Sequence, residues 1–280
     1  MLQRAAVPGL AWRWKLKTNN KNRMKMNYKL SVRRVLCSLP VLACLLFTTF
    51  SHAGDSKVFP PSYAWNNNFN DPNGYINMSF GTGSNPQWTA WWNVPGPNLY
   101  GYPASIRGWH YGFNPANDNL FPKQIASVTS IPCSFSYNCG GTISGDFAYD
   151  CFLRWDNLKS SPQLEVMVWT RNNSYPIGTV LARGIITENG VTYDLWGGNN
   201  TSAGYYVYTF LPQRSGVPSS VPTGSGSANI DLKHFLDKLA GQSGGYGYNH
   251  WMYLDVVEAG FEVVNGNGWA SCTWFTCTAN

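Results

Sequence analysis

Glutamate is scarce beyond residue 53, where only four occur, and two of them lie in segments that suit catalysis. Glu165 belongs to a strand-like run, residues 164–170, in which alternate side chains point to opposite faces. The alternation places Glu165, Met167 and Trp169 on one face. A face exposed to solvent seldom carries a methionine and a tryptophan beside its carboxylate, whereas a groove that binds sugar rings does. We therefore expect Glu165 to act inside such a groove.

A second carboxylate, Glu262, shares a strand face with Glu258 and Gly260, and the glycine leaves room for a ligand or a neighbouring backbone. Two carboxylates that converge from different strands are the minimal machinery for glycoside hydrolysis, because one attacks or activates water and the other protonates the leaving oxygen. Asp150 lies in a third strand-like run and can tune the nucleophile through a hydrogen bond. A lone glutamate in a strand is more often an exposed edge charge, so the hypothesis depends on the pair.

The composition indicates an all-β protein that can position these groups. Charged residues make up 12% and aromatic residues 15% of the chain, with 28 glycines and 17 prolines, a balance that favours strands and turns over helical bundles. Runs with alternating or aromatic character are separated by Asn-Gly, Gly-Gly and Pro-Gly breaks. We expect strands at residues 75–80, 88–93, 143–155, 164–170, 180–187, 191–196, 205–211 and 253–264.

One segment has a helical pattern instead. Residues 229–242 have apolar side chains at helical spacing, Asn229 or Asp231 can cap the start, and Gly241 ends it. The preceding stretch, residues 219–227, indicates a surface loop. The predicted fold is therefore an all-β jelly-roll sandwich of two antiparallel sheets, with a concave substrate cleft and one packed α-helix.

Residues 1–53 have the layout of a secretory signal peptide. They carry ten lysines and arginines and no acid, with an apolar run at residues 35–50 and an Ala-x-Ala-like cleavage site ending at Ala53. The apolar run holds 16 residues, including Pro40, which is short for a membrane span, and an uncleaved anchor is the alternative. We expect a secreted protein with a single domain over residues 54–280 and no membrane contact after cleavage.

The charge of the chain is divided unevenly. The basic leader is long for a signal peptide, so Met24 or Met26 is an alternative start.

Beyond residue 53 the chain holds ten bases and all 14 acids, so the positive net charge belongs to the leader. A nucleic-acid partner is not expected, because no clustered lysines and arginines are left for phosphate contacts. We expect a monomer.

Five cysteines follow the leader, and export would permit disulfides. Cys133 with Cys139, and Cys272 with Cys277, are two close pairs that can each close a local loop. Cys151, within an apolar run, is expected to be a buried thiol. The odd count leaves other pairings open. No histidine lies at ligand spacing from these cysteines, so no zinc site is expected.

Several segments together resemble glycoside hydrolase family 12, a family of secreted endo-β-1,4-glucanases and xyloglucanases. Residues 165–169 resemble the strand of the family's nucleophile, residues 259–262 its acid/base segment, and residues 149–152 the strand whose aspartate supports the nucleophile. Residues 101–104 and 108–112 resemble the strand and bend that border the family's substrate cleft. The resemblance spans nearly the whole chain beyond the leader.

The resemblance implies a retaining reaction in which Glu165 forms a glycosyl-enzyme and Glu262 acts first as acid and then as base, with Asp150 in support. Mutual repulsion and burial would raise the pKa of Glu262, so that it is protonated while Glu165 is ionised. The substrate would be a β-glucan polysaccharide, and no metal or organic cofactor is required. The residues implied in substrate binding are Trp65, Phe69, Trp109, His110, Met167 and Trp169.

The chain departs from the family pattern in two places. Residues 65–70 replace a motif whose tryptophan stacks on glucose, so either Trp65 or Phe69 takes that role. Glu258 stands where the family has a glutamine. A non-catalytic, lectin-like β-glucan-binding protein is the alternative from another class, since tryptophans also line binding faces. A jelly-roll xylanase fits less well, because Glu165 is followed by Val-Met-Val-Trp and not by a tyrosine-rich run.

Overall fold

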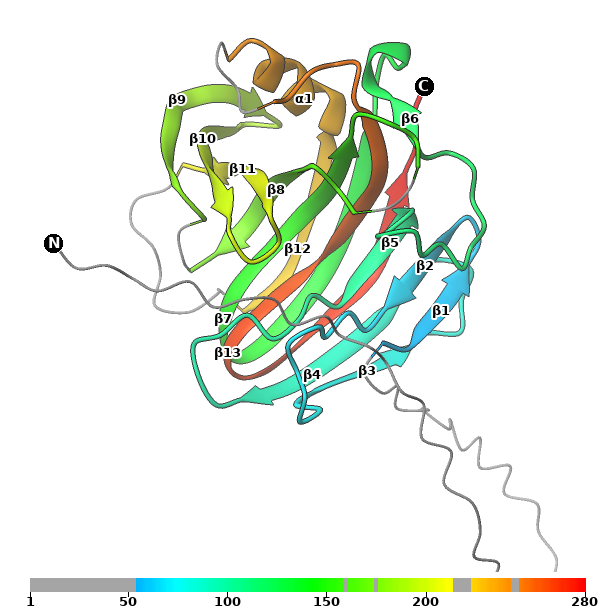
Figure 1. The fold of residues 1–280 in the computed structure, drawn as a ribbon. Helices are drawn as coiled ribbons and strands as arrows, with labels where there is room; N and C mark the ends of the chain where they lie inside the picture. Colours follow the sequence, from blue (N-terminus) through cyan, green and yellow to red (C-terminus); the bar gives the residue numbers. More distant parts are fainter. Residues whose placement is uncertain (1–53, 159–160, 174–175, 214–222, 243–246) are drawn as a thin grey trace, which may run out of the picture. The chain divides into compact units, whose positions relative to one another are not determined.

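The structure is a computed structural model of the 280-residue chain. It describes residues 54–158, 161–173, 176–213, 223–242 and 247–280 (Figure 1). The signal peptide expected at residues 1–53 lies outside the described residues and stays a prediction. Within the described ranges, no helix has the length and apolar character needed to cross a membrane.

The described chain is mostly β, as predicted, and its 13 strands join in one hydrogen-bonded network. The main path runs β1-β2-β5-β13-β7-β8-β11-β10-β9, with β12, β3, β4 and β6 attached to it. Paired strands are antiparallel except β8 and β11, which pair in parallel. The elements are β1 Ser56–Phe59, β2 Ser62–Trp65, β3 Ile76–Phe80, β4 Trp88–Val94, β5 Ala104–Gly108, β6 Lys123–Gln124, a 3₁₀ helix Ile125–Ser127, β7 Pro132–Arg154, β8 Leu164–Asn172, β9 Thr179–Glu188, β10 Val191–Asn200, β11 Tyr205–Pro212, β12 Gly224–Asp231, α1 Leu232–Ala240 and β13 Tyr253–Cys277.

Two long strands, β7 and β13, of 23 and 25 residues, pair with each other and belong to two layers. Residues 146–153 of β7 pair with β8, and residues 256–260 of β13 pair with β5. Residues 132–139 of β7 pair instead with β12, and residues 266–272 of β13 with β4. We call the first set, with β1, β2 and β8 to β11, the inner layer. The second set, with β3, β4 and β12, is the outer layer.

The long strands bend so that their halves face each other across the core. The rings of Tyr137 and Phe147, from opposite halves of β7, stack with centroids 4.0 Å apart. In a straight strand, residues ten positions apart would be separated by about 33 Å. Gly145 lies at the bend with a φ of 146°, and a Cβ there would meet the carbonyl oxygen of Glu262 at 1.8 Å. The bend therefore requires glycine.

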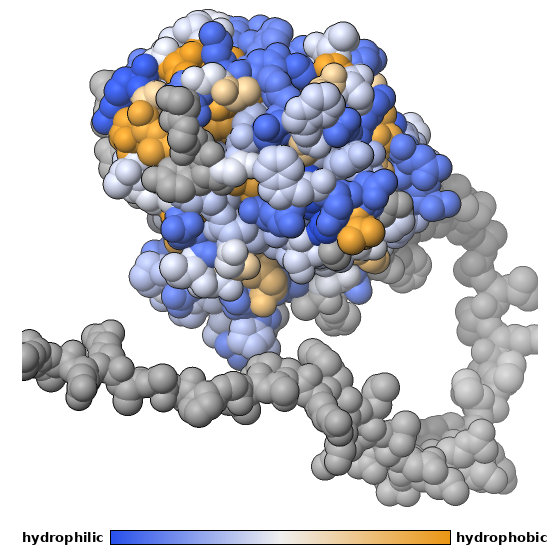
Figure 2. Space-filling model, turned by 45° about the horizontal axis from the view of Figure 1, so that its top comes forward, coloured by the Kyte–Doolittle hydropathy of each residue, from blue (hydrophilic) through white to orange (hydrophobic). Residues whose placement is uncertain are grey.

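Inward-facing side chains of the two layers form one large core that is rich in aromatic rings. Trp92 of β4 stacks on Phe261 of β13 across this core, at 5.0 Å. On the face drawn in Figure 2, hydrophobic residues form small separate areas among hydrophilic ones. Most large apolar side chains are thus buried between the layers, which is the arrangement expected of a β-sandwich.

The predicted helix is confirmed as α1. The Asp231 carboxylate accepts a hydrogen bond from a backbone N–H of the first turn, so Asp231 and not Asn229 caps the start. Phe235 packs edge-on against Tyr193 of β10, with ring centroids 5.2 Å apart. The buried stripe of α1 therefore fastens the helix to the end of the inner layer.

The loop expected at residues 219–227 is wrong for its second half, because residues 224–227 begin β12 and pair with β7. Residues 219–222 lie outside the described residues. A Cβ at Gly226 would meet the ring of Tyr137 at 2.6 Å, so glycine allows β12 to lie close to that ring. The small residues here serve close packing of strands, although their composition is typical of turns.

Neither predicted disulfide forms. Cys133 and Cys139 lie six residues apart on β7, and Cys272 and Cys277 five apart on β13. Residues so spaced in a strand are about 16–20 Å apart, well beyond the reach of a disulfide. Cys133 and Cys277 face each other in the β7–β13 ladder instead, with Sγ atoms 3.4 Å apart. Cys151 is a buried thiol, as predicted.

Candidate active site

Four carboxyl groups lie in two facing pairs on the inner halves of β7 and β13. Asp146 is opposite Glu262, and Asp150 is opposite Glu258, in the antiparallel register. Each strand spaces its two carboxyls four residues apart, so all four point to the same face. Phe261, next to Glu262, points into the core, so the carboxyls point away from it. We call this side of the inner layer the site face.

Glu165 lies on the neighbouring strand β8, and Met167, two residues on, is opposite Asp150 of β7. Glu165 is 8% exposed and Asp150 is 7% exposed, whereas Glu262 is half-buried. The charges of all three interact, which places them in one electrostatic cluster. The fold thus brings together the three carboxyls that the sequence predicts to be catalytic.

The ionisation of Glu165 is controlled by burial and by its neighbours. Burial raises the pKa of Glu165 to about 8, and the charge of Glu262 adds to the rise. Hydrogen bonds from Tyr205 and Asp150 oppose the rise, because they stabilise the ionised carboxylate. The hydroxyl of Tyr205 also lies 3.0 Å from that of Tyr111, which is 44% exposed. A short chain of polar groups therefore leads from the surface to Glu165.

The protonated form of Asp150 is favoured in this setting. Burial raises the pKa of Asp150 well above its usual value, and the charge of Glu165 contributes next. A protonated carboxyl can donate a hydrogen bond, so Asp150 can donate to the Glu165 carboxylate. This is the contact that the sequence predicts for a supporting residue, and its effect on catalysis stays a prediction.

The rise in the pKa of Glu165 differs from the sequence prediction, in which Glu165 is the ionised member of the pair. The reason is that Glu165 is buried more deeply than Glu262 and also interacts with the charge of Glu258. Two carboxyls that repel each other tend to share one proton. A nucleophilic role for Glu165 requires its ionised form, which the hydrogen bonds from Tyr205 and Asp150 favour.

Glu258 is fully buried and is paired with a histidine. The Nδ1 atom of His110 lies 2.5 Å from Glu258 Oε1. The His110 ring meets the indole of Trp65 edge-on, with centroids 4.7 Å apart. His110, which the resemblance implies in substrate binding, is thus held by a carboxyl of the site and in turn packs against Trp65.

Two polar residues of the site were missed by the sequence reasoning. Asp146 is 1% exposed, and burial, followed by the charge of Glu262, raises its pKa well above the usual value. A signal was available, because Asp146 precedes Asp150 by four residues and so shares its face. Tyr205 had no such signal, because it reaches Glu165 from β11, which neighbours β8 only in the folded chain.

The residues implied in substrate binding differ in accessibility. Met167 and Trp169 are each 4% exposed and pack in a small cluster with β11 residues. Trp65 and Trp109 are half-buried. Phe69 is 55% exposed. Their contacts with substrate stay predictions, and Phe69 presents the most open ring of the set.

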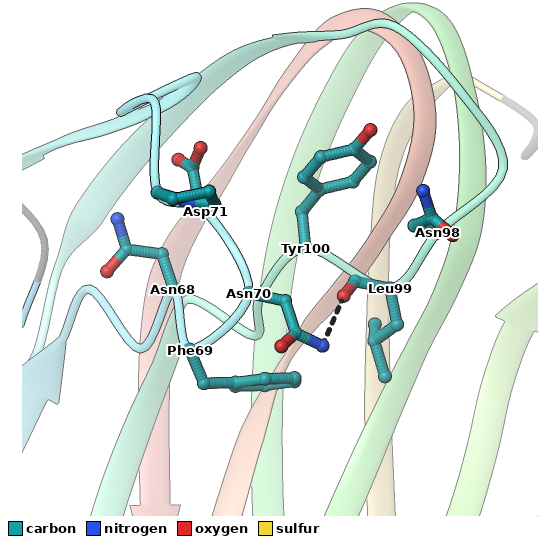
Figure 3. A pocket seen from close by; sticks show the side chains of 8 residues that line it. Asn68, Phe69, Asn70, Asp71, Asn98, Leu99 and Tyr100 are labelled. Atoms are coloured by element: carbon teal, nitrogen blue, oxygen red, sulfur yellow. Dashed lines mark hydrogen bonds between the residues drawn. The ribbon is translucent and has the colours of Figure 1, made fainter.

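Phe69 lines a hollow of about 750 Å³. Figure 3 shows the rings of Phe69 and Tyr100 on opposite sides of the Asn70 side chain. The N–H of Tyr100 donates to the carbonyl oxygen of Val263, the residue after Glu262, at 2.8 Å. The hollow therefore lies beside the strand that carries the predicted acid/base. Its lining residues are Asn68, Phe69, Asn70, Asp71, Pro72, Asn98, Leu99 and Tyr100.

The chemistry of the site face is that of carboxyl groups. Among the described residues, no group of three or more His, Cys, Asp or Glu side chains is arranged to hold a metal ion. A buried carboxylate that accepts two hydrogen bonds, with a second carboxyl across the sheet, can supply both a nucleophile and a proton donor. Such a pair can cleave an acetal linkage.

Residues 62–280 match the family model described as Glycosyl hydrolase family 12. The chain belongs to glycosyl hydrolase family 12. The matched residues include all five carboxyls of the site face, and the resemblance seen in the sequence motifs is confirmed.

Two relatives show how far the similarity of this family 12 chain extends. A xyloglucan-specific endo-beta-1,4-glucanase A from Aspergillus niger is 33% identical over 150 residues, which are 51% of this chain and 56% of that protein. An inactive glycoside hydrolase XLP1 from Phytophthora nicotianae is 29% identical over 150 residues, which are 52% of this chain and 57% of that protein. The chain spans just over half the length of these relatives.

The fold of the family 12 chain is similar to that of the native family 12 xyloglucanase from Bacillus licheniformis, with a TM-score of 0.67. The two are 21% identical, and the match covers 83% of this chain and 100% of that chain. A likeness at this identity establishes the fold alone. The predicted fold class, an all-β jelly-roll sandwich with one α-helix, is confirmed.

Proposed function

We propose that this family 12 protein is an endo-acting β-1,4-glucanase that hydrolyses internal linkages of β-glucan chains with retention of configuration. The observation that carries the proposal is the buried carboxylate of Glu165, which interacts with Glu262 and accepts hydrogen bonds from Asp150 and Tyr205. Cellulose, mixed-linkage glucan and xyloglucan are the candidate substrates. Xyloglucan is supported by the name of the Aspergillus niger relative.

The first displacement forms a covalent intermediate. The Glu165 carboxylate attacks the anomeric carbon, the bond from that carbon to the glycosidic oxygen breaks, and Glu262 gives its proton to the departing oxygen. The hydrogen bonds from Asp150 and Tyr205 favour the ionised form of Glu165 and hold its oxygens in place. They therefore oppose the effect of burial on the nucleophile.

The second displacement releases the sugar. Glu262, now a carboxylate, takes a proton from water, the water oxygen bonds to the anomeric carbon, and Glu165 leaves as a carboxylate. Two displacements at the same carbon restore its configuration. Burial favours the protonated form of Asp146 beside Glu262, and this form stabilises the Glu262 carboxylate during this half of the cycle.

Replacement of the nucleophile tests the proposal. Glu165→Gln should lower the release of reducing ends from carboxymethyl cellulose, mixed-linkage β-glucan and xyloglucan by about 10³-fold or more. Glu188→Gln is the matched control, because Glu188 lies on β9 and contacts His234, outside the carboxyl cluster. Near-normal turnover by Glu165→Gln would contradict the assignment.

The stereochemistry of the product gives a second test. Proton NMR of a fresh digest should show the β-anomer first, followed by slow mutarotation. An α-anomer as first product would indicate a single displacement by water, and the nucleophilic role of Glu165 would then be wrong.

A non-catalytic β-glucan-binding protein is the second candidate, favoured by one observation, the word inactive in the name of the Phytophthora nicotianae relative. That candidate predicts adsorption to glucan without release of reducing ends. It also predicts that adsorption is indifferent to Glu165→Gln and Glu262→Gln. The hydrogen bonds to Glu165 favour the catalytic candidate, because a binding protein has no need for an ionised carboxylate there.

We also propose that the protein is secreted and monomeric. Expression of the full chain should yield protein in the medium whose first residue is Gly54, and it should sediment as a monomer. Protein held in the membrane fraction with the leader still attached would favour the anchor alternative.

A further inference from the structure

The outer layer carries no charged side chain over most of its area. β3, β4, residues 132–144 of β7, residues 224–230 of β12 and residues 265–277 of β13 contain no Asp, Glu, Lys, Arg or His. Side chains of these strands alternate between the core and the solvent. The solvent side, which we call the outer face, displays serine, threonine, asparagine and tryptophan.

Two tryptophans lie side by side on the outer face. Trp91 of β4 and Trp269 of β13 are directly opposite in the antiparallel register, and each is 37% exposed. Asn77 of β3 continues the row on one side and Gly140 of β7 on the other. Figure 1 shows β3, β4 and the final part of β13 as neighbours in this layer. The two indoles therefore project from directly opposed positions on the outer face.

Gly140 leaves room for the indole of Trp269 next to the backbone of β7. A Cβ there would meet Nε1 of Trp269 at 2.6 Å, so the indole lies across the backbone of the neighbouring strand. A third tryptophan, Trp274, is 48% exposed and lies further along β13, opposite Ser136. The outer face thus carries a further exposed tryptophan, five residues along β13 from Trp269.

Amides and hydroxyls flank the tryptophan pair in the neighbouring rows of the sheet. These rows are Asn93, Asn267 and Thr142 on one side, and Thr89, Ser271 and Asn138 on the other. Such side chains both donate and accept hydrogen bonds. The outer face therefore combines ring surfaces with neutral hydrogen-bonding groups.

This combination selects a neutral, hydroxylated partner. Sugar rings have C–H faces that pack on indoles and hydroxyls that hydrogen-bond to amides. A nucleic acid or a charged protein surface would meet no opposite charge on the strands of the outer face. Clustered exposed aromatic rings also mark binding surfaces more often than inert ones.

We propose that the outer face, centred on Trp91 and Trp269, is a second binding surface for β-glucan chains, separate from the site of Glu165. Its ligand class rests on the proposed function. The outer face and the site face lie on opposite sides of the two layers, so a glucan surface can hold the protein while another chain segment occupies the site. The surface retains the protein on insoluble glucan and takes no part in bond cleavage.

Adsorption to regenerated cellulose tests the second surface. Purified protein with Glu165→Gln is used, so that the matrix is not degraded and every variant keeps the same site face. Under these conditions Trp91→Ala with Trp269→Ala should weaken adsorption about fivefold or more. Trp251→Ala is the matched control, since it removes a tryptophan that is 64% exposed but lies outside the outer layer. It should leave adsorption unchanged.

Three results would overturn the proposal. The first is unchanged adsorption of the double alanine variant, and the second is an equal loss in Trp251→Ala. The third is a change of oligomeric state without a change in adsorption, in which the parent sediments as a dimer and the double variant as a monomer. The outer face would then bind a second copy of the chain and not glucan. If alanine impairs folding, Trp91→Phe with Trp269→Phe should give an intermediate loss, and parental adsorption would again overturn the proposal.

Failure of the proposed function is distinguishable from failure of the second surface. With Glu165 intact, the double variant should cleave soluble cello-oligosaccharides at the parental rate and lose activity only on insoluble cellulose. A parent that adsorbs through Trp91 and Trp269 yet cleaves no glucan would disprove the proposed function and support the second surface. A parent that cleaves glucan but adsorbs independently of these tryptophans would support the proposed function and disprove the second surface.

Discussion

The two halves of β7 and β13 have opposite surface chemistry. In the inner half, Asp146, Asp150, Glu258 and Glu262 share one face and are buried or half-buried. In the outer half, the same two strands carry no charged residue, and their solvent side includes Trp269 with small polar residues. The same two strands stay paired in both halves, with a register shift between Val263 and Asn265, so the difference lies in the side chains and in what covers them. One strand pair can therefore carry a reactive site and an uncharged surface on separate faces.

The inner half also buries its ionisable groups, which opposes their ionisation. Burial is the first cause of the raised pKa values of Asp146, Asp150 and Glu165. Placing ionisable groups there costs stability, which the aromatic core between the layers must offset. The outer half has no such cost. Substitutions in the inner half should therefore change activity and pH dependence, and substitutions in the outer half should change neither.

The largest effect is expected at Glu262. Glu262→Gln keeps the size of the side chain but removes its proton transfer, so kcat on a soluble β-glucan should fall about 10²- to 10⁴-fold. Asn267→Ala, five residues further along β13, should keep the parental rate in the same reducing-end assay. Equal losses in both variants would remove the functional difference between the halves.

The bend that separates the halves should depend on Gly145. Gly145→Ala places a methyl group against the Glu262 carbonyl oxygen at a φ that side chains rarely adopt. The free energy of unfolding in urea should fall by about 2 kcal/mol or more. Gly96→Ala, where the added group meets open space, should change it by less than about 0.5 kcal/mol. A fully stable Gly145→Ala protein would show that the bend tolerates a side chain.

Stability should fall as the pH rises from about 5 to about 8. The pKa values of Asp146, Asp150 and Glu165 are raised in the fold, so the folded protein keeps protons that the unfolded chain loses above its ordinary carboxyl pKa. Their contribution is complete at low pH and declines until the folded pKa is passed, at about 8 for Glu165. The thermal unfolding midpoint should accordingly be higher at about pH 5 than at about pH 8.

Asp146→Asn sharpens that measurement, because asparagine has no proton to lose. The variant should unfold a few degrees higher than the parent at about pH 8 and show little difference at about pH 5. A parental pH dependence in the variant would mean that Asp146 does not retain its proton in the fold.

The smallest effect is expected for Asn267→Asp in the outer half. The side chain is exposed, and its new carboxylate stays ionised between about pH 5 and about pH 8. The free energy of unfolding should change by less than about 0.5 kcal/mol, with the same pH slope as the parent. A changed slope would indicate that charges on the outer face act on the site face.

The inner half was the more predictable one. Residues 164–170 and 253–264 were expected as strands, and they lie in β8 and β13. Alternation of apolar and polar residues is a local signal of a half-buried strand, and it placed Glu165 and Glu262 on the correct faces. The helix was equally readable, because apolar spacing and the Asp231 cap are both local.

The outer half was largely missed. Residues 132–142 and 265–277 are strands although they include Gly140 and an Asn-Gly-Asn-Gly run, which are typical of turns. Their extended conformation is enforced by pairing with β12 and β4. The wrong disulfides have the same origin, since loops were expected where long strands separate the cysteines.

By itself, the sequence determined what depends on neighbours along the chain: the strand faces of Glu165, Glu262 and Asp150, the helix with its cap, and the motifs of family 12. Only the tertiary structure decided which strands are adjacent. Strand adjacency brings Tyr205 to Glu165 and sets Cys133 opposite Cys277. The tertiary structure also raises the pKa of Glu165, because burial and the charges of other strands are set by the complete fold.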